Sequence, residues 1–224
     1  NVPDVVTLPQ YFKQNGYTTI GLGKTFHNNI PDTLSWTRKP HIEGYPFDPD
    51  AVYLNEENLK IQEDKIQRMI AEGRNRIDQL GHWYVKANAI EIAEAEDDDY
   101  FDGAQTSLAI EILNELAKEK EAFFLSVGYY RPHLPFNAPK KYWDLYDRAS
   151  LPLAGNQFLP EGSPEYAIHG DQELRSYDDC HDLPWPNEEP WNEARQRELL
   201  HGYYASVSSI DAQVGRLLDE LDKL

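Results

Sequence analysis

The sequence predicts an α/β fold, in the order helix, strand, helix, helix, strand, helix along 224 residues. Two observations support this prediction. Residues 17–22 and 122–127 are short runs rich in β-branched, aromatic or apolar residues, and segments with helical periodicity separate them. The second run, Ala-Phe-Phe-Leu-Ser-Val, is nearly all apolar, which is typical of a strand buried on both faces of a parallel sheet. We therefore expect a mainly parallel sheet between helices, connected by right-handed crossovers.

Each predicted helix has a local signal. Residues 7–15 favour a short helix that Gly16 ends, because glycine readily takes the left-handed conformation that follows helices. Residues 55–75 are charged, with a thin apolar stripe. Residues 102–118 and 195–221 repeat apolar side chains at helical steps, which predicts two amphipathic helices.

Two stretches predict loops. Residues 28–47 are rich in Pro, Asn, Asp and Gly, and residues from about 150 to 192 are proline-rich without periodicity. The chain also holds 15 Pro, 14 Tyr and 5 Trp, a composition that indicates long ordered loops rather than a helical bundle. Loops this long are usually functional or insertions, so we interpret 150–192 as a long loop insertion.

Charge and composition exclude several functions. The formal net charge is −18, which argues against nucleic acid as a partner because its phosphates are bound by Lys and Arg. Net charge does not fix the field inside a cleft, so a local anion site stays compatible with it. The single cysteine, Cys180, excludes an internal disulfide framework and a multi-cysteine zinc site. No stretch approaches the roughly 18 apolar residues of a membrane helix, so no membrane association is expected.

Candidate chemistry follows both predicted strands. Lys24 and His27 come directly after the first strand, and His133 follows the second strand between Pro132 and Pro135. Ligands of α/β folds bind beyond the carboxyl ends of the strands. A lysine ammonium there can neutralise a tetrahedral anion, and an imidazole can move protons near pH 7. A surface lysine and loop-packing histidines are the alternative, but their predicted convergence at one sheet edge favours an anion site.

Acidic segments are weaker candidates. Residues 97–99 are three consecutive aspartates, but they lack the spaced ligands of a calcium loop, and such runs are usually solvated. Residues 178–182 combine Asp, Cys and His, yet no second pair follows at metal-ligand spacing. We therefore predict no metal-ligating residues in this chain.

Three ordered blocks resemble the sulfatase family, in its iduronate-2-sulfatase-like branch. The first is residues 7–17 followed by Gly-Lys-Thr-Phe-His at 23–27, whose two residues between Lys and His are similar to that branch. The second, 123–136, reads Phe-Phe-Leu-Ser-Val-Gly-Tyr-Tyr-Arg-Pro-His-Leu-Pro-Phe. The third is 203–218, and together the blocks span nearly the whole chain.

This resemblance implies an alkaline-phosphatase-like fold and hydrolysis of a sulfuric ester of a sugar. It implies a formylglycine nucleophile, made from cysteine in a C-x-P-S-R segment, and a bound Ca²⁺. By position, Lys24 would bind a sulfate oxygen, His27 would take a proton from the nucleophile, and His133 would bind sulfate and assist the leaving alcohol. Arg131, Trp36 and His41 are candidate sugar contacts.

The sequence departs from the family pattern at the nucleophile. No C-x-P-S-R segment is present, and Cys180 is followed by His-Asp-Leu. We therefore expect residues 1–224 to be the central part of one catalytic domain, inactive alone, with the nucleophile and calcium ligands on its remaining N- and C-terminal parts. The resemblance also implies a periplasmic or extracellular location. Two alternatives stay open: a phosphate- or phosphonate-ester hydrolase of the same superfamily, and a non-catalytic relative that binds glycan.

Overall fold

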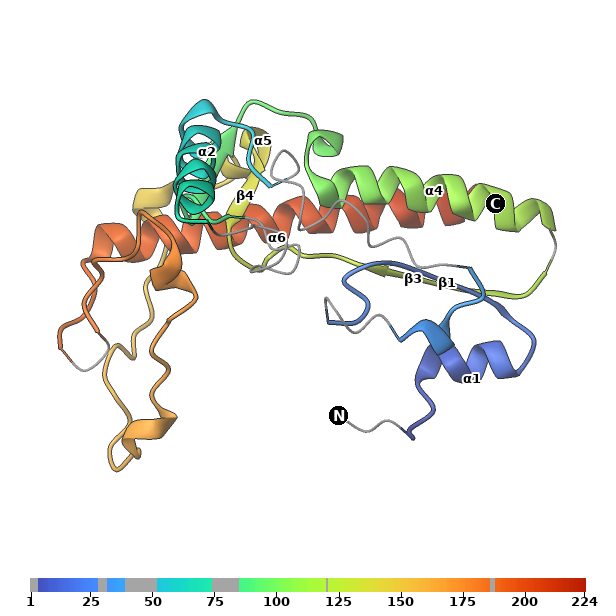
Figure 1. Cartoon of the computed structure of the whole chain (residues 1–224), viewed down its shortest axis with the longest axis horizontal. Coiled ribbons are helices and arrows are strands. Elements are labelled where there is room, and N and C mark those ends of the chain that lie inside the picture. The colour runs from blue at the N-terminus through green and yellow to red at the C-terminus, as the bar shows by residue number, and fades with distance from the viewer. Residues whose placement is uncertain (1–3, 28–31, 39–51, 74–84, 120, 186–187) are drawn as a thin grey trace. The chain divides into compact units, whose positions relative to one another are not determined.

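The computed structural model describes residues 4–27, 32–38, 52–73, 85–119, 121–185 and 188–224 (Figure 1). The chain forms two compact units. Unit 1 comprises residues 1–45, 97–131 and 210–224, and unit 2 comprises 46–96 and 132–209.

Unit 1 is built on two parallel strands, β1 (Thr18–Gly23) and β3 (Phe123–Gly128), which lie side by side in Figure 1. They pair in register from Thr18 opposite Phe123 to Gly23 opposite Gly128, so both strands end at the same edge. This pairing confirms the predicted parallel arrangement of the two strands and places the segments that follow them next to each other.

Helices cover both faces of this pair of strands. On one face, Ile20 and Leu22 of β1 pack against Ile112 and Leu116 of helix α4 (Phe101–Glu119). On the other, Phe12 of helix α1 (Leu8–Gln14) stacks on Phe124, with ring centroids 4.7 Å apart. Side chains alternate between the faces of a strand, so in β3 Phe123 and Leu125 pack on the α4 side and Phe124 packs on α1.

The prediction that β3 is buried on both faces is wrong in the described part of the chain. All six of its residues are half-buried, whereas we expected a strand buried on both faces. The physical reason is the position of β3 in the sheet. Among the described residues, its hydrogen-bonded neighbour is β1, and its other edge has none.

Unit 2 contains helix α2 (Glu56–Ala71), strands β2 (Ile90–Ala93) and β4 (Phe136–Pro139), and the short helix α5 (Lys140–Trp143). The two strands pair in parallel, with Ile90 opposite Phe136. The sequence analysis missed both strands. Each has four residues, too few for a periodic signal, and their pairing joins segments far apart in the chain.

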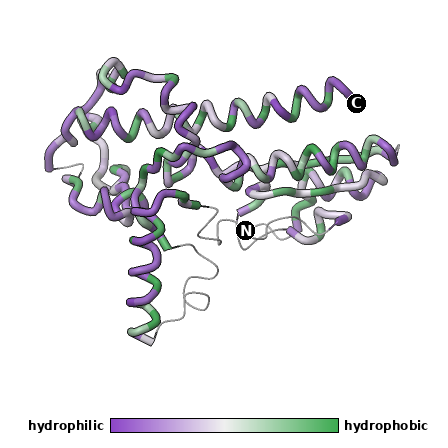
Figure 2. Tube along the Cα trace, turned by 90° about the horizontal axis from the view of Figure 1, so that it is seen from above, coloured by the Kyte–Doolittle hydropathy of each residue, from purple (hydrophilic) through white to green (hydrophobic). Residues whose placement is uncertain are grey.

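The last helix, α6 (Glu193–Leu221), contributes residues to both units. Its bounds, like those of α1, α2 and α4, agree with the predicted helices. Figure 2 shows hydrophilic and hydrophobic residues alternating along the helices, the pattern from which they were predicted. The described part of the predicted loop insertion, residues 150–192, includes the one-turn 3-10 helices Glu165–Ala167 and Leu174–Ser176. None of the described helices is long and apolar enough to cross a membrane.

Candidate active site

The ends of β1 and β3 are joined by their backbones. The Lys24 N–H donates to the Gly128 carbonyl at 2.8 Å. Gly23 has a φ of +56°, a left-handed conformation that L residues with side chains rarely adopt. Gly128 needs its small size for another reason, because a Cβ there would collide with the Lys24 backbone. The two glycines therefore allow the two strand ends to approach each other closely.

Lys24 and His27 form the first half of the candidate site. The Lys24 Nζ lies 2.9 Å from His27 Nδ1. An ammonium group can only donate, so Nδ1 accepts, and a neutral His27 ring carries its proton on Nε2. The Lys24 Nζ also lies 5.7 Å from the centroid of the Tyr130 ring. The arrangement sets a cation beside an imidazole, with Lys24 half-buried and His27 exposed.

Helix α4 forms hydrogen bonds with the end of β3 and with the two residues Tyr130 and Arg131 that follow it. The Asp102 carboxylate accepts the backbone N–H groups of Tyr130 at 2.9 Å and Arg131 at 3.0 Å. Burial raises the pKa of Asp102, and the nearby Arg131 charge acts in the opposite direction. The Gln105 side chain donates to the Gly128 carbonyl at 2.9 Å, the oxygen that also accepts from Lys24.

Sequence reasoning missed Asp102 and Gln105, although a signal was present. Polar residues Asp102, Gln105 and Thr106 follow helical spacing on the side of α4 that continues as Ala109 and Ile112. All five are buried. A polar start to an otherwise apolar helix face indicates side chains that bond to buried backbone.

Arg131 and Trp36 are both buried. Arg131 is 7 % exposed, and its charge acts on Asp102. Trp36 is 5 % exposed, packs over Gly21 and meets the Phe26 ring edge-to-face at 5.9 Å. Both side chains thus support the fold of unit 1, and their role as sugar contacts stays a prediction. His41 lies outside the described residues.

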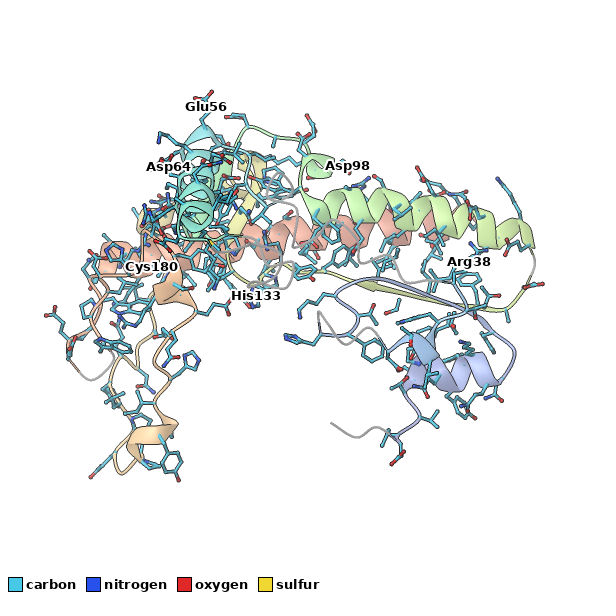
Figure 3. The ribbon with its side chains drawn as sticks, in the orientation of Figure 1. Arg38, Glu56, Asp64, Asp98, His133 and Cys180 are labelled. Atoms are coloured by element: carbon cyan, nitrogen blue, oxygen red, sulfur yellow. The ribbon has the colours of Figure 1, made fainter. Side chains whose placement is uncertain are left out.

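His133, the third predicted catalytic residue, lies in unit 2 (Figure 3). Its Nδ1 lies 2.8 Å from the Leu134 carbonyl, which can only accept, so Nδ1 carries a proton. Its Nε2 faces the Glu173 carboxylate at 3.4 Å, and both side chains are about half exposed. Lys86 Nζ lies 3.5 Å from the other oxygen of Glu173. Sequence reasoning missed Glu173, which lies in the predicted loop insertion without a motif to mark it.

The three predicted catalytic side chains are divided between the units, with Lys24 and His27 in unit 1 and His133 in unit 2. Each unit, taken by itself, has a cationic or proton-carrying group of the kind that an anion site needs. The convergence of all three on one anion stays a prediction.

The weaker candidates have structural partners. Asp98 pairs with Arg216 at 2.9 Å. Cys180 is buried, and burial together with the Asp179 charge raises the pKa of its thiol to about 12. A thiol with that pKa stays protonated at neutral pH and is a poor nucleophile. Within the described ranges, no group of three or more His, Cys, Asp or Glu side chains could hold a metal ion.

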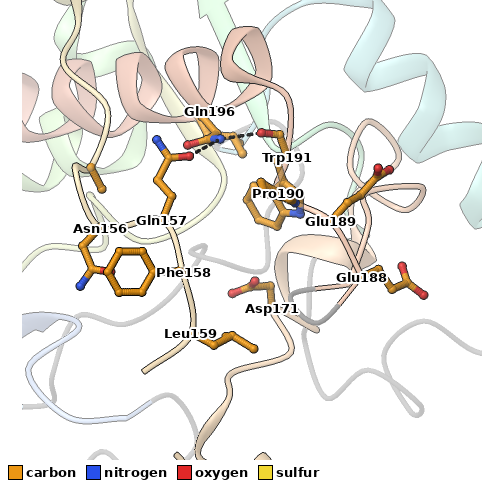
Figure 4. A pocket seen from close by; sticks show the side chains of 12 residues that line it. Asn156, Gln157, Phe158, Leu159, Asp171, Glu188, Glu189, Pro190, Trp191 and Gln196 are labelled. Carbon is orange, nitrogen blue, oxygen red and sulfur yellow. Dashed lines mark hydrogen bonds between the residues drawn. The ribbon is translucent and has the colours of Figure 1, made fainter. Parts of the chain in front are cut away.

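A hollow of about 660 Å³ lies in unit 2, among residues of the loop insertion and the start of α6 (Figure 4). Phe158, Leu159 and Trp191 form part of its wall, together with carboxylate side chains from Asp171, Glu188 and Glu189. Carboxylates repel an anionic ester, so this hollow does not suit sulfate. The strand-end site is the better candidate for an anion.

The fold is α/β, and a lysine at the end of a strand is a group that can bind a tetrahedral anion. Comparison with known proteins makes this specific. The Sulfatase family model matches residues 3–224, and the chain belongs to this family.

Two relatives and one solved structure illustrate the match. Mouse (Mus musculus) iduronate 2-sulfatase is 31% identical over 223 residues, covering 97% of this chain and 37% of the relative. A sulfatase from Formosa agariphila is 29% identical, covering 97% of this chain and 38% of the relative. The phosphonate monoester hydrolase of Agrobacterium radiobacter has a TM-score of 0.49 at 16% identity, covering 97% of this chain and 44% of that structure. The chain therefore spans little more than a third of the relatives' length.

Proposed function

We propose that residues 1–224 are the central part of a sulfatase catalytic domain that removes sulfate from a sulfated sugar. The observation that carries this proposal is the Lys24–His27 pair, 2.9 Å apart at the joined ends of β1 and β3, in a member of the sulfatase family. A sulfuryl group in transfer spreads negative charge over its oxygens, and a fixed cation stabilises that charge.

The residues of this chain then have separate roles. Lys24 binds a sulfuryl oxygen through its ammonium. His27 takes a proton from the nucleophile through Nδ1, the unprotonated nitrogen of its neutral ring, when the Lys24 ammonium leaves that atom to bind the anion. His133 uses Nε2 to bind sulfate and to protonate the leaving alcohol, while Leu134 holds Nδ1. Its position two residues after Arg131 supports a place near the same strand end.

We propose that the nucleophile and the ligands of a Ca²⁺ ion lie in segments outside this chain. They would supply the attack on sulfur and further neutralisation of negative charge. Cys180 does not fit the nucleophile, since its thiol is buried and its sequence differs from C-x-P-S-R. The described residues also contain no group that fits a metal, so no residue here is assigned to one.

The relatives guide the choice of substrate. Iduronate 2-sulfatase, whose name refers to the uronate iduronate, is one of the relatives that match 97% of this chain. We therefore expect a sulfated uronate or a similar glycan, rather than a phosphonate ester, to be hydrolysed.

The test uses the full-length protein and its Lys24→Ala variant. Sulfate release is measured from a 2-sulfated uronate disaccharide, an aryl sulfate and choline sulfate, with a phosphonate monoester beside them. Loss of one preorganised charge-stabilising group typically lowers kcat by about 10²–10³-fold, which is the effect expected for Lys24→Ala. Lys60→Ala, which removes an exposed lysine of α2, is the matched control and should leave kcat unchanged. Sulfate release by Lys24→Ala at the wild-type rate would refute the proposal. Phosphonate turnover without sulfate release would favour the phosphonate-ester hydrolase, and binding of glycan without turnover of any ester would favour the non-catalytic relative.

A further inference from the structure

Tyr130 is fixed in place by two adjacent residues of α4. Its backbone N–H donates to the buried Asp102 carboxylate at 2.9 Å. Its ring meets the Phe101 ring edge-to-face, with centroids 5.9 Å apart. One residue holds the backbone and the other holds the ring. The first turn of α4 therefore sets both the position and the orientation of Tyr130.

The Tyr130 ring in turn contacts the Lys24 ammonium, whose Nζ lies 5.7 Å from the ring centroid. The negative face of an aromatic ring attracts a cation at this distance. A lysine side chain has many rotamers, and fixing it costs up to about 2 kcal/mol of conformational entropy. A ring already held by α4 limits those rotamers before an anion arrives.

An aromatic partner also carries no negative charge of its own. A carboxylate in this place would cancel the positive charge that an anion needs, whereas a neutral ring does not. Burial and the Asp102 charge both raise the pKa of the Tyr130 phenol well above its usual range. The hydroxyl therefore stays protonated at neutral pH, and Tyr130 acts through its ring rather than as a base.

We propose that Tyr130 is a positioning residue that orients the Lys24 ammonium toward the sulfuryl group, with Phe101 and Asp102 holding Tyr130. This inference rests on the proposed function, since it assumes that Lys24 binds the anion. Sequence alone gives no such role, because Tyr129 and Tyr130 are indistinguishable by pattern. The structure separates them: Tyr129 bonds to Thr106 at 2.9 Å, whereas the Tyr130 ring faces Lys24.

Tyr130→Phe and Tyr130→Leu in the full-length protein test the ring directly. Phenylalanine keeps the aromatic face, so kcat/KM and the inhibition constant of inorganic sulfate should stay within about twofold of wild type. Leucine removes the face, so kcat/KM should fall and the inhibition constant of inorganic sulfate should rise, each by about 3- to 10-fold. Thermal unfolding of each variant controls for folding, and Tyr130→Met replaces the leucine variant if that variant does not fold.

A double-mutant cycle separates positioning from general stability. In a Lys24→Ala background, Tyr130→Leu should cause no further loss, because the residue on which it acts is gone. Equal damage by phenylalanine and leucine, no damage by leucine, or an undiminished loss in the Lys24→Ala background would each overturn the inference alone. Wild-type activity of Lys24→Ala itself would instead overturn the proposed function, and the inference with it.

Discussion

Gly128→Ala tests how closely the two strand ends must approach. Gly128 is the last residue of β3 and lies opposite Gly23. A Cβ at position 128 would lie 2.2 Å from the Lys24 carbonyl carbon. That neighbour is backbone, so no side chain can rotate away to make room. The Lys24 segment itself must move.

The expected size of the effect follows from this geometry. Ordinary van der Waals contact begins at 3.4 Å, so the Lys24 backbone must shift by about 1.2 Å. Misplacing a catalytic group by about 1 Å can lower the rate about 10²-fold. Inserting a methyl group into a packed site also costs about 1–3 kcal/mol in the free energy of unfolding. Gly128→Ala should therefore lower kcat/KM strongly and stability moderately.

The assay compares kcat/KM for sulfate release with the free energy of unfolding in urea, both on the full-length protein. Gly215→Ala is the matched control, since a Cβ there meets nothing within 4 Å. Gly215 lies inside α6, so alanine should raise the free energy of unfolding by up to about 1 kcal/mol and leave kcat/KM unchanged. If Gly128→Ala kept the wild-type kcat/KM and stability, the close approach of the strand ends would not position Lys24.

Two further predictions concern charged side chains. Glu173→Gln removes the carboxylate that faces His133, and because both side chains are about half exposed, their interaction is worth at most about 1 kcal/mol. The variant should therefore lower kcat roughly two- to fivefold, whereas the control Glu161→Gln in the same loop insertion should leave kcat unchanged. Equal kcat for the two variants would exclude a role for Glu173. The raised pKa of Asp102 means that the folded state binds its proton more tightly than the unfolded state. The stabilising contribution of the bound proton is thus full below pH 3.8 and is lost as pH rises through the folded pKa. As pH rises above 3.8, the free energy of unfolding should therefore fall less in Asp102→Asn than in wild type. Urea unfolding measured at several pH values checks this, and parallel pH dependences of the two proteins would contradict it.

Local patterns were sufficient for the long elements. Residues 102–118 were predicted as a helix from apolar spacing, and the structure has α4 at Phe101–Glu119. The strand predicted at 17–22 is β1, Thr18–Gly23. The four-residue strands β2 and β4 were missed, because long-range pairing and the buried Glu91, which accepts from Leu54 and Asn55, stabilise them rather than their own composition.

The sequence by itself determined which residues follow the strands: Lys24 and His27 after β1, and His133 after β3. It also determined the family, through motifs that need no coordinates. Only the tertiary structure decided the partners of those residues, namely the Tyr130 ring for Lys24 and the Glu173 carboxylate for His133. The physical reason is that propensity and periodicity are local. Hydrogen-bond partners, burial and tautomers depend on side chains brought together from distant parts of the chain.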